Sequence, residues 1–170
     1  MVLATPALAT PNQQSIYGLN EHVFIMDPEL AVSAKLDTGA QTASLSAKDI
    51  QRFRRNGESW VRFVIAADGA SEETIERPLA RISKIKRRAG DYDPEQDGKT
   101  YTARPVIELE LCMGDKQRTI EVNLTDRSAF EFPLLIGSDA LSQFNALIDP
   151  SRTYIAGKPS CSLTNANAAE

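Results

Sequence analysis

Hydrophobic and polar residues alternate along several short stretches of this chain, which is the pattern of β-strands that bury one face. Residues 32–36 have the sequence Val-Ser-Ala-Lys-Leu, with apolar side chains at every second position, and Asp37 follows directly. Residues 60–65 alternate in the same way around Arg62. The pattern predicts a strand in each stretch, and the first strand carries an acidic side chain at its end.

The clearest strand pair lies between residues 104 and 124. Apolar residues occupy every second position over 107–111 and again over 120–124, and Gly114 with Asp115 supplies a turn between them. These features predict an antiparallel hairpin.

Three other stretches are less regular. Apolar residues over 75–85 lie three or four positions apart, which permits a helix, but Pro78 would interrupt it, so we expect a strand pair over 74–85. A short helix is expected over 47–55. Residues 87–100 are rich in glycine, proline and charge and are too polar to bury, which indicates the tip of a hairpin.

The C-terminal part combines short strands with a helix. Residues 134–137 have the sequence Leu-Leu-Ile-Gly, and residues 138–144 suit one or two helical turns. Closing strands are expected over 146–149 and 153–156, around a turn at Pro150. The chain is therefore predicted to be mainly β, with a short C-terminal helix.

The composition fits one globular domain. The 170 residues are 42% hydrophobic and 25% charged, which allows a modest core. We assign the domain to residues 17–160, a leader to 1–16 and a disordered tail to 161–170. The net charge of −4 and the pI of about 5.1 argue against nucleic-acid binding, which needs a basic surface. No apolar run approaches the roughly 20 residues of a membrane-spanning helix.

The first residues and the cysteines bear on the cellular location. Ala7-Leu8-Ala9 matches the pattern before a signal-peptidase site, which favours a signal-peptide remnant and a periplasmic or otherwise exported protein. The stretch lacks a basic start and is broken by Pro6, as in a disordered leader of a cytoplasmic protein. Cys112 and Cys161 leave two states open, a disulfide in an oxidising compartment or two buried free thiols.

Asp37-Thr38-Gly39 is the candidate for catalysis. Water is a poor nucleophile for an amide carbon, but two carboxylates that share one proton can activate it, one as base and the other as donor to the carbonyl oxygen. Repulsion between two close carboxylates lets only one of them ionise. In this motif a strand delivers the acid, the threonine hydroxyl can brace the backbone across the site, and glycine allows a close turn.

The tripeptide alone is a weak signal, since an ordinary Asx turn can have the same sequence. Its context is more specific: an apolar strand precedes it, Ala40 follows it, and Leu-Leu-Ile-Gly-Ser-Asp-Ala-Leu stands at 134–141. This order of motifs resembles the lobes of retropepsin-like and pepsin-like peptidases. The resemblance implies that Asp37 is the catalytic carboxylate and that its scaffold consists of Thr38, Gly39, Ala40, Ile136 and Gly137.

A closer resemblance is to the bacterial, RimB-like retropepsin family often labelled "ATP-dependent zinc protease", some of whose members are associated with RimK-type glutamate ligases. It covers roughly residues 17–157 and rests on segments 34–42, 104–106 and 123–128. The chain departs from the family at 45–47, where Leu-Ser-Ala replaces the common Leu-His-Ala. The resemblance implies a closed β-barrel lobe, aspartic peptidase activity, and a peptide or protein substrate that includes glutamate-rich tails.

The chain has one Asp-Thr-Gly turn, whereas a pepsin-like enzyme has two, so one copy supplies half of a dyad. With the family, this implies a twofold homodimer with Asp37 of each subunit on the axis. The polar segment 87–100 then falls where retropepsins carry a flap, with Gly90, Asp91, Tyr92 and Gly98 as flap residues. A specificity loop or plug is the alternative interpretation.

The family label also names zinc and ATP, and the residues argue against both. Catalytic zinc usually takes three ligands dominated by histidine, whereas the chain has one histidine, His22, and no H-E-x-x-H motif. It also lacks a G-x-x-x-x-G-K-[ST] loop for nucleotide phosphates. We therefore expect no metal and no cofactor, and interpret His22 as a surface or packing residue.

Other charged residues have structural interpretations. Asp139 is a possible second acid, but a helix cap is favoured. Asp149 is interpreted as a turn residue and Asp126-Arg127 as an ion pair or turn. The basic run over 81–88 is typical of a solvated strand edge, with steering of acidic substrates as the alternative.

Two function classes follow from the sequence. The first is an aspartic endopeptidase. The second is a non-catalytic retropepsin-like binding module that uses the same groove, and the intact Asp-Thr-Gly motif favours the first.

Overall fold

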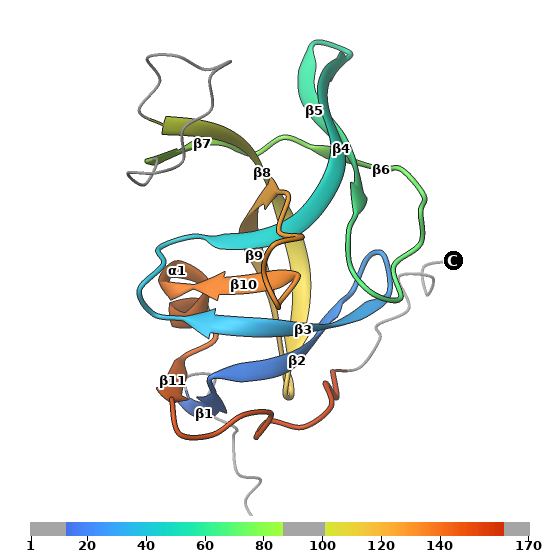
Figure 1. Cartoon of the computed structure of the whole chain (residues 1–170). Helices are drawn as coiled ribbons and strands as arrows, with labels where there is room; N and C mark the ends of the chain where they lie inside the picture. The colour runs from blue at the N-terminus through green and yellow to red at the C-terminus, as the bar shows by residue number, and fades with distance from the viewer. Residues whose placement is uncertain (1–12, 87–100, 162–170) are drawn as a thin grey trace, which may run out of the picture.

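The computed structural model describes residues 13–86 and 101–161, which form a mainly β fold with one short helix (Figure 1). Within these ranges no helix has the length and apolarity needed to cross a bilayer. In chain order the elements are β1 (Ser15–Gly18), β2 (Asn20–Ile25), β3 (Leu30–Asp37), β4 (Ala43–Arg55), β5 (Glu58–Ile65), β6 (Ile75–Pro78), β7 (Arg81–Lys86), β8 (Tyr101–Met113), β9 (Lys116–Thr125), β10 (Leu134–Gly137), α1 (Ser138–Gln143) and β11 (Ala146–Asp149).

Six of the described strands form a closed barrel in the order β10, β3, β2, β8, β9, β4, and the pairing of β10 with β4 closes it. In β3, Val32, Ala34 and Leu36 are buried while Ala31 and Lys35 are exposed. Full burial of a leucine-sized side chain contributes roughly 1.5–3 kcal/mol. The predicted mainly β fold, with a closed barrel and a short C-terminal helix, is confirmed.

Beyond the barrel, β4 continues into a long hairpin arm with β5, at the top of Figure 1. The arm turns at Asn56-Gly57, where φ is 51° and 82°, the combination that a two-residue hairpin turn requires. On its surface the Arg55 guanidinium lies 4.4 Å from the ring centroid of Trp60. The arm is therefore held by its own turn and side-chain contacts.

The segment after β11 lies against the barrel through a buried carboxylate. The side chain of Glu21 accepts hydrogen bonds from the backbone N–H groups of Gly18 (2.7 Å), Ile155 (3.1 Å) and Ala156 (3.2 Å). Nearby, β1 pairs in parallel with β11. The first and last described strands therefore meet in one small sheet.

Cys112 and Cys161 form a disulfide, with their Cα atoms 6.0 Å apart, which decides between the two states that the sequence left open. Beside it, the Ser160 backbone N–H donates to the Gly114 carbonyl at 2.7 Å. The end of the described chain is thereby fastened to the turn between β8 and β9.

The helix expected over 47–55 is wrong, because these residues belong to β4. The strand pairs with β9 and β10 over residues 43–46 and with β5 over residues 47–48 and 51–55. An irregularity between Lys48 and Gln51, with Asp49 at φ 54°, separates the two parts. Pairing with distant strands, rather than local periodicity, decides the structure here.

The strand expected over 153–156 is also wrong. The segment is a turn region in which Tyr154 has φ 55° and the Gly157 N–H donates to the Tyr154 carbonyl at 3.4 Å. The strands expected over 74–85 are present as β6 and β7, but they pair with β5 and β8 respectively and not with one another.

Candidate active site

Asp37 is the last residue of β3, and a tight turn over residues 38–42 follows it. The Asp37 Oδ1 atom accepts a hydrogen bond from the Gly39 N–H at 3.0 Å, and the Ala40 N–H donates to the Asp37 carbonyl at 3.3 Å. The side chain of Asp37 is 31% exposed. The turn therefore holds the carboxylate by one oxygen and leaves it accessible to a ligand.

β10 supports this turn from behind. Gly137 lies opposite Asp37 in the parallel pairing of β10 with β3, and Ile136, opposite Leu36, is fully buried. Just beyond β10, the Ser138 N–H donates to the Ala40 carbonyl at 2.7 Å. Ile136 and Gly137 therefore lie beside the acidic turn.

Two neighbours of Asp37 are open to solvent. Thr38 is exposed, and the structure records no hydrogen bond of its hydroxyl to any residue of the described ranges. The Lys35 Nζ lies 3.9 Å from the Asp37 Oδ2, with the lysine side chain 46% exposed. An ion pair this exposed contributes little stability, so the second carboxylate oxygen of Asp37 has no strong partner within the described chain.

A buried polar group connects the turn to β8. Asn123 is 2% exposed, and its Nδ2 donates to the Thr42 Oγ1 at 3.1 Å and to the Ala43 carbonyl at 2.7 Å. Its Oδ1 accepts a hydrogen bond from the Arg104 Nη1 at 3.2 Å. Burial lowers the pKa of the Arg104 guanidinium.

A second arginine lies in the loop between β9 and β10. Arg127 is only 7% exposed; its Nε donates to the Phe132 carbonyl at 3.2 Å, and its guanidinium lies 4.6 Å from the ring centroid of Phe130. Burial lowers the pKa of Arg127, the charge of Arg104 lowers it further, and the charge of Asp37 raises it. Arg127 is therefore within electrostatic reach of both Arg104 and Asp37.

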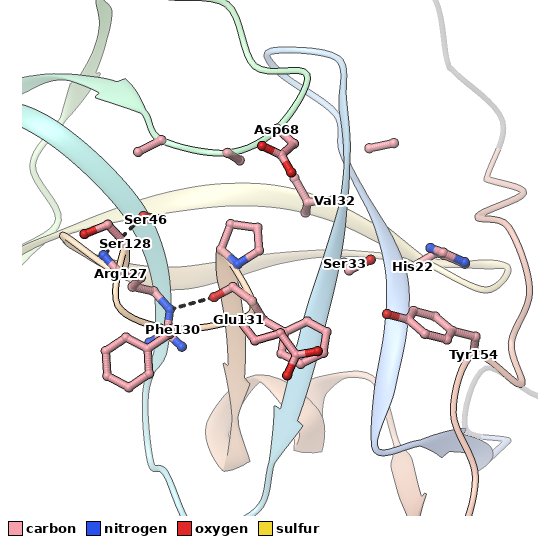
Figure 2. Close-up of a pocket in the computed structure, with 15 residues that line it drawn as sticks. His22, Val32, Ser33, Ser46, Asp68, Arg127, Ser128, Phe130, Glu131 and Tyr154 are labelled. Carbon is pink, nitrogen blue, oxygen red and sulfur yellow. Dashed lines mark hydrogen bonds between the residues drawn. The ribbon is translucent and has the colours of Figure 1, made fainter.

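The cavity in Figure 2, of about 590 Å³, opens beside this loop. Arg127, Phe130 and Glu131 line one side, and His22 and Tyr154 line the other. The rings of His22 and Tyr154 stack with centroids 4.4 Å apart, which agrees with the interpretation of His22 as a packing residue. Asp37 does not line this cavity, so the cavity and the acidic turn are separate features.

The three other acidic residues considered from the sequence lie at the start of the helix or in turns. Asp139 lies in the first turn of α1, but no side chain caps this helix, so the capping interpretation is wrong. Asp149 accepts hydrogen bonds from the Ser151 Oγ and N–H, which hold the pKa of its carboxyl below its usual value. Asp126 forms a similar turn, in which the Ser128 N–H lowers the pKa of the carboxyl.

The basic run begins on β7, which pairs on one side with β8. Arg81 forms an ion pair with Glu121 at 2.7 Å, and the Lys84 Nζ lies 5.0 Å from the ring centroid of Tyr101. These exposed contacts agree with a solvated strand edge. The four flap residues predicted at 90, 91, 92 and 98 lie outside the described residues.

The sequence assigned no role to Arg104 or Asn123, and it indicated that Arg127 forms an ion pair or a turn with Asp126. All three lie in segments that carry the family resemblance, 104–106 and 123–128, which was the only available signal. In the part of the chain that the structure describes, no three histidine, cysteine or acidic side chains are arranged to hold a metal ion.

Comparisons with known proteins agree with this fold. Residues 16–159 match the family model described as "RimB-like: Retropepsin-like aspartic endopeptidase RimB". A crystal structure of protein Lpg0085 of unknown function (DUF785) from Legionella pneumophila superposes with a TM-score of 0.69 at 37% identity, covering 85% of this chain and 99% of that one.

Curated relatives carry a different description. Proteins named "Probable alpha-L-glutamate ligase" from Shewanella pealeana and Desulfotalea psychrophila are 31% and 32% identical over 128 and 139 residues. The matches cover 75% and 78% of this chain but 26% and 28% of the relatives, so the chain spans about a quarter of their length. Since the family model covers nearly the whole described domain, the chain belongs to the RimB-like family of retropepsin-like aspartic endopeptidases.

Proposed function

We propose that the chain is an aspartic peptidase whose active site is completed by Asp37 of a second copy. The observation that carries the proposal is the position of Asp37 at the end of β3, with one oxygen bound by the Gly39 N–H and the side chain 31% exposed. The same turn is supported by Gly137 of β10. This arrangement suits a carboxylate that must be rigid and still reach substrate.

In the proposed reaction the two Asp37 carboxylates share one proton. The ionised carboxylate takes a proton from a water molecule, whose oxygen attacks the peptide carbonyl carbon, while the protonated carboxyl donates to the carbonyl oxygen. When the resulting gem-diol collapses, the C–N bond breaks. The carboxyl that took the proton from water gives it to the amine nitrogen, and the other carboxylate takes a hydroxyl proton from the gem-diol, which restores the shared proton. Neither step needs a metal or an organic cofactor.

A second copy is proposed because the chain has a single Asp-Thr-Gly turn. A twofold axis beside Asp37 would bring the two carboxylates together. It would also give the exposed Thr38 hydroxyl a backbone acceptor in the partner, the bracing role expected of this threonine. Segment 87–100, which joins β7 to β8, would serve as the flap over bound substrate.

The proposed substrate is a peptide or protein chain, including glutamate-rich tails. Support comes from the curated relatives, whose name describes glutamate ligation and which share about a quarter of their length with this chain. We also propose export to the periplasm, with support from the Cys112–Cys161 disulfide, because such bonds persist mainly in oxidising compartments.

The test is an Asp37→Asn variant that is mixed with the wild type. The variant alone should cleave peptides at acidic to neutral pH at least about a thousandfold more slowly, within the range that acid–base groups contribute. If sites are shared, excess variant should also suppress wild-type activity as mixed dimers form, whereas an inert protein added at equal concentration should not. Activity that survives in a purely monomeric sample, by sedimentation, would exclude the two-chain site.

Two further results would contradict the proposed peptidase mechanism. Activity abolished by EDTA would require a metal and contradict the dyad. A wild type that binds peptide but cleaves none would make the domain a binding module.

A further inference from the structure

The proposed reaction does not use the cavity in Figure 2, because Asp37 does not line it. Its volume of about 590 Å³ lies within the range of about 300–1,000 Å³ that is typical of ligand pockets. Such pockets are lined mainly by apolar and aromatic side chains with a few polar groups. The rings of His22, Phe130 and Tyr154 give this cavity the same character.

One wall of the cavity is the ring pair of His22 and Tyr154, whose planes lie 27° apart. The backbone fixes Tyr154, since its N–H donates to the Asn20 carbonyl at 2.8 Å and the next two N–H groups donate to Glu21. Tyr154 also has φ 55°, which is unusual for a bulky residue and is found at ligand clamps. The ring pair is therefore held in place without a ligand.

The opposite wall is Phe130, whose ring lies on the buried guanidinium of Arg127. The Phe130 N–H donates to the Arg127 carbonyl at 2.8 Å, and the Arg127 Nε donates to the Phe132 carbonyl at 3.2 Å. Phe130 is nevertheless 62% exposed. The arginine is therefore a fixed support, and most of the phenyl surface is available for contact.

Small side chains lie between the two walls. Ala31, Ser33, Ala66 and Ala67 all line the cavity, and the Ala66 N–H donates to the Ser46 carbonyl at 3.0 Å. These side chains are short, so they leave space between the rings on either side. Aromatic rings attract one another in stacked or edge-to-face contacts with centroids about 4.5–7 Å apart. The cavity therefore suits a flat aromatic group.

The position of the cavity on β3 indicates where such a group would come from. Ser33, Lys35 and Asp37 all lie on the outward face of β3, and Ser33 lines the cavity. Four residues of a strand span about 13 Å. A polypeptide that reaches Asp37 can therefore extend along this face to the cavity.

We propose that the cavity is a second recognition site, which takes an aromatic side chain of a polypeptide about 13 Å from Asp37. The polypeptide nature of the guest rests on the proposed function, whereas the preference for an aromatic ring rests on the two walls. Both walls are preformed, so the guest orders little of the protein when it binds.

NMR spectroscopy tests the site directly, because His22 is the single histidine of the chain and its imidazole signals report on the cavity. A blocked peptide of three glycines, phenylalanine and three glycines is titrated at constant pH into the full chain carrying Asp37→Asn, which prevents cleavage. Its counterpart has leucine in place of phenylalanine. The phenylalanine peptide should move the His22 signals and bind about 2- to 12-fold more tightly, because only it makes ring contacts. Unmoved His22 signals, or equal affinities, would overturn the site.

Phe130→Ala should weaken binding of the phenylalanine peptide by about tenfold or more, as the loss of an aromatic contact residue does. The matched control is Tyr101→Ala, which also removes an exposed ring beside a cation, Lys84, but outside the cavity. It should leave the affinity unchanged. Equal weakening by both variants would mean unspecific ring contacts, and unchanged affinity in Phe130→Ala would exclude that wall; either result overturns the site. Thermal melting confirms that both variants are folded.

Cleavage by the chain with Asp37 intact separates this site from the proposed function. If that chain cleaves peptides but the phenylalanine peptide does not move the His22 signals, the recognition site fails and the peptidase stands. If the ring-selective binding is found but no peptide is cleaved, the peptidase fails and the recognition site stands.

Discussion

Gly137 lies opposite Asp37 where β10 pairs with β3, and a Cβ atom at Gly137 would lie 2.6 Å from the Thr42 carbonyl oxygen. That distance is far shorter than a normal contact. Only glycine at position 137 therefore lets β10 pass this close to the backbone of residues 41 and 42. The support of the acidic turn by β10 therefore requires that position 137 has no side chain.

Gly137→Ala should destabilise the fold by about 1–3 kcal/mol, as overpacking does, and should reduce peptidase activity even in the folded fraction. Denaturant unfolding and specific activity measure the two effects. Gly18→Ala is the matched control, since its Cβ would meet the Arg152 carbonyl oxygen at 2.6 Å, in the pairing of β1 with β11 and not in the support of the acidic turn by β10. It should lose similar stability and keep its specific activity; equal inactivation of both variants would contradict the role of Gly137.

Glu21→Gln should weaken the attachment of the segment around Ile155 and Ala156. The carboxylate accepts three backbone N–H groups, whereas an amide NH2 cannot accept. The Ala156 N–H would then keep only its 3.3 Å bond to one oxygen and face an amide donor in place of the other, which it now contacts at 3.2 Å. The expected loss is about 1–3 kcal/mol in the free energy of unfolding. Glu29→Gln, on an exposed side chain, is the control and should change stability little. If Glu21→Gln is as stable as Glu29→Gln, the role of Glu21 in attaching this segment is refuted.

Reduction of the disulfide should lower the stability of the domain by roughly 2–4 kcal/mol, because it releases a constraint across 49 residues of the chain. Urea unfolding with and without reductant measures the difference. A Cys112→Ser, Cys161→Ser double variant should match the reduced protein and no longer respond to reductant. A wild type insensitive to reductant would show that the bond contributes nothing.

The Ser151 bonds to Asp149 predict a pH effect. They hold the pKa of Asp149 below its usual value in the folded state, so the stability they contribute is present above the unfolded pKa and is lost as pH falls through the folded one. Ser151→Ala should raise the pKa of Asp149 toward the usual value, measured by carbon-detected NMR titration. Asp126, with its own partner Ser128, should be unaffected; a shift of both would indicate a global change.

The sequence predicted the parts of the site that local motifs encode. Asp37 at a strand end and Gly137 after two aliphatic residues each carry their signal within a few neighbours, so their positions could be anticipated. The barrel strands were predictable for the same reason, since the alternation in β3, β8 and β9 is continuous along each strand.

What the sequence could not predict depends on distant contacts. Arg104 is connected to the acidic turn through Asn123 and Thr42, and no periodicity relates these positions. The helix expected over 47–55 failed because β9, β10 and β5 all pair with that segment. The strand expected over 153–156 failed because only the Tyr154 N–H bonds to a strand, at the Asn20 carbonyl, while the N–H groups of Ile155 and Ala156 bond to the Glu21 side chain.

The pairing of β10 with β3 also determines when, during synthesis of the chain, the acidic turn can gain its supporting strand. Asp37 leaves the ribosome about a hundred residues before Gly137, which at 5–20 residues per second is a delay of roughly 5–20 s. During that interval the acidic turn has no strand behind it, and the barrel lacks the member that closes it. The turn and its supporting strand can therefore come together only after synthesis of the domain is nearly complete, so in an unfinished chain Asp37 lies in a turn that β10 does not yet support.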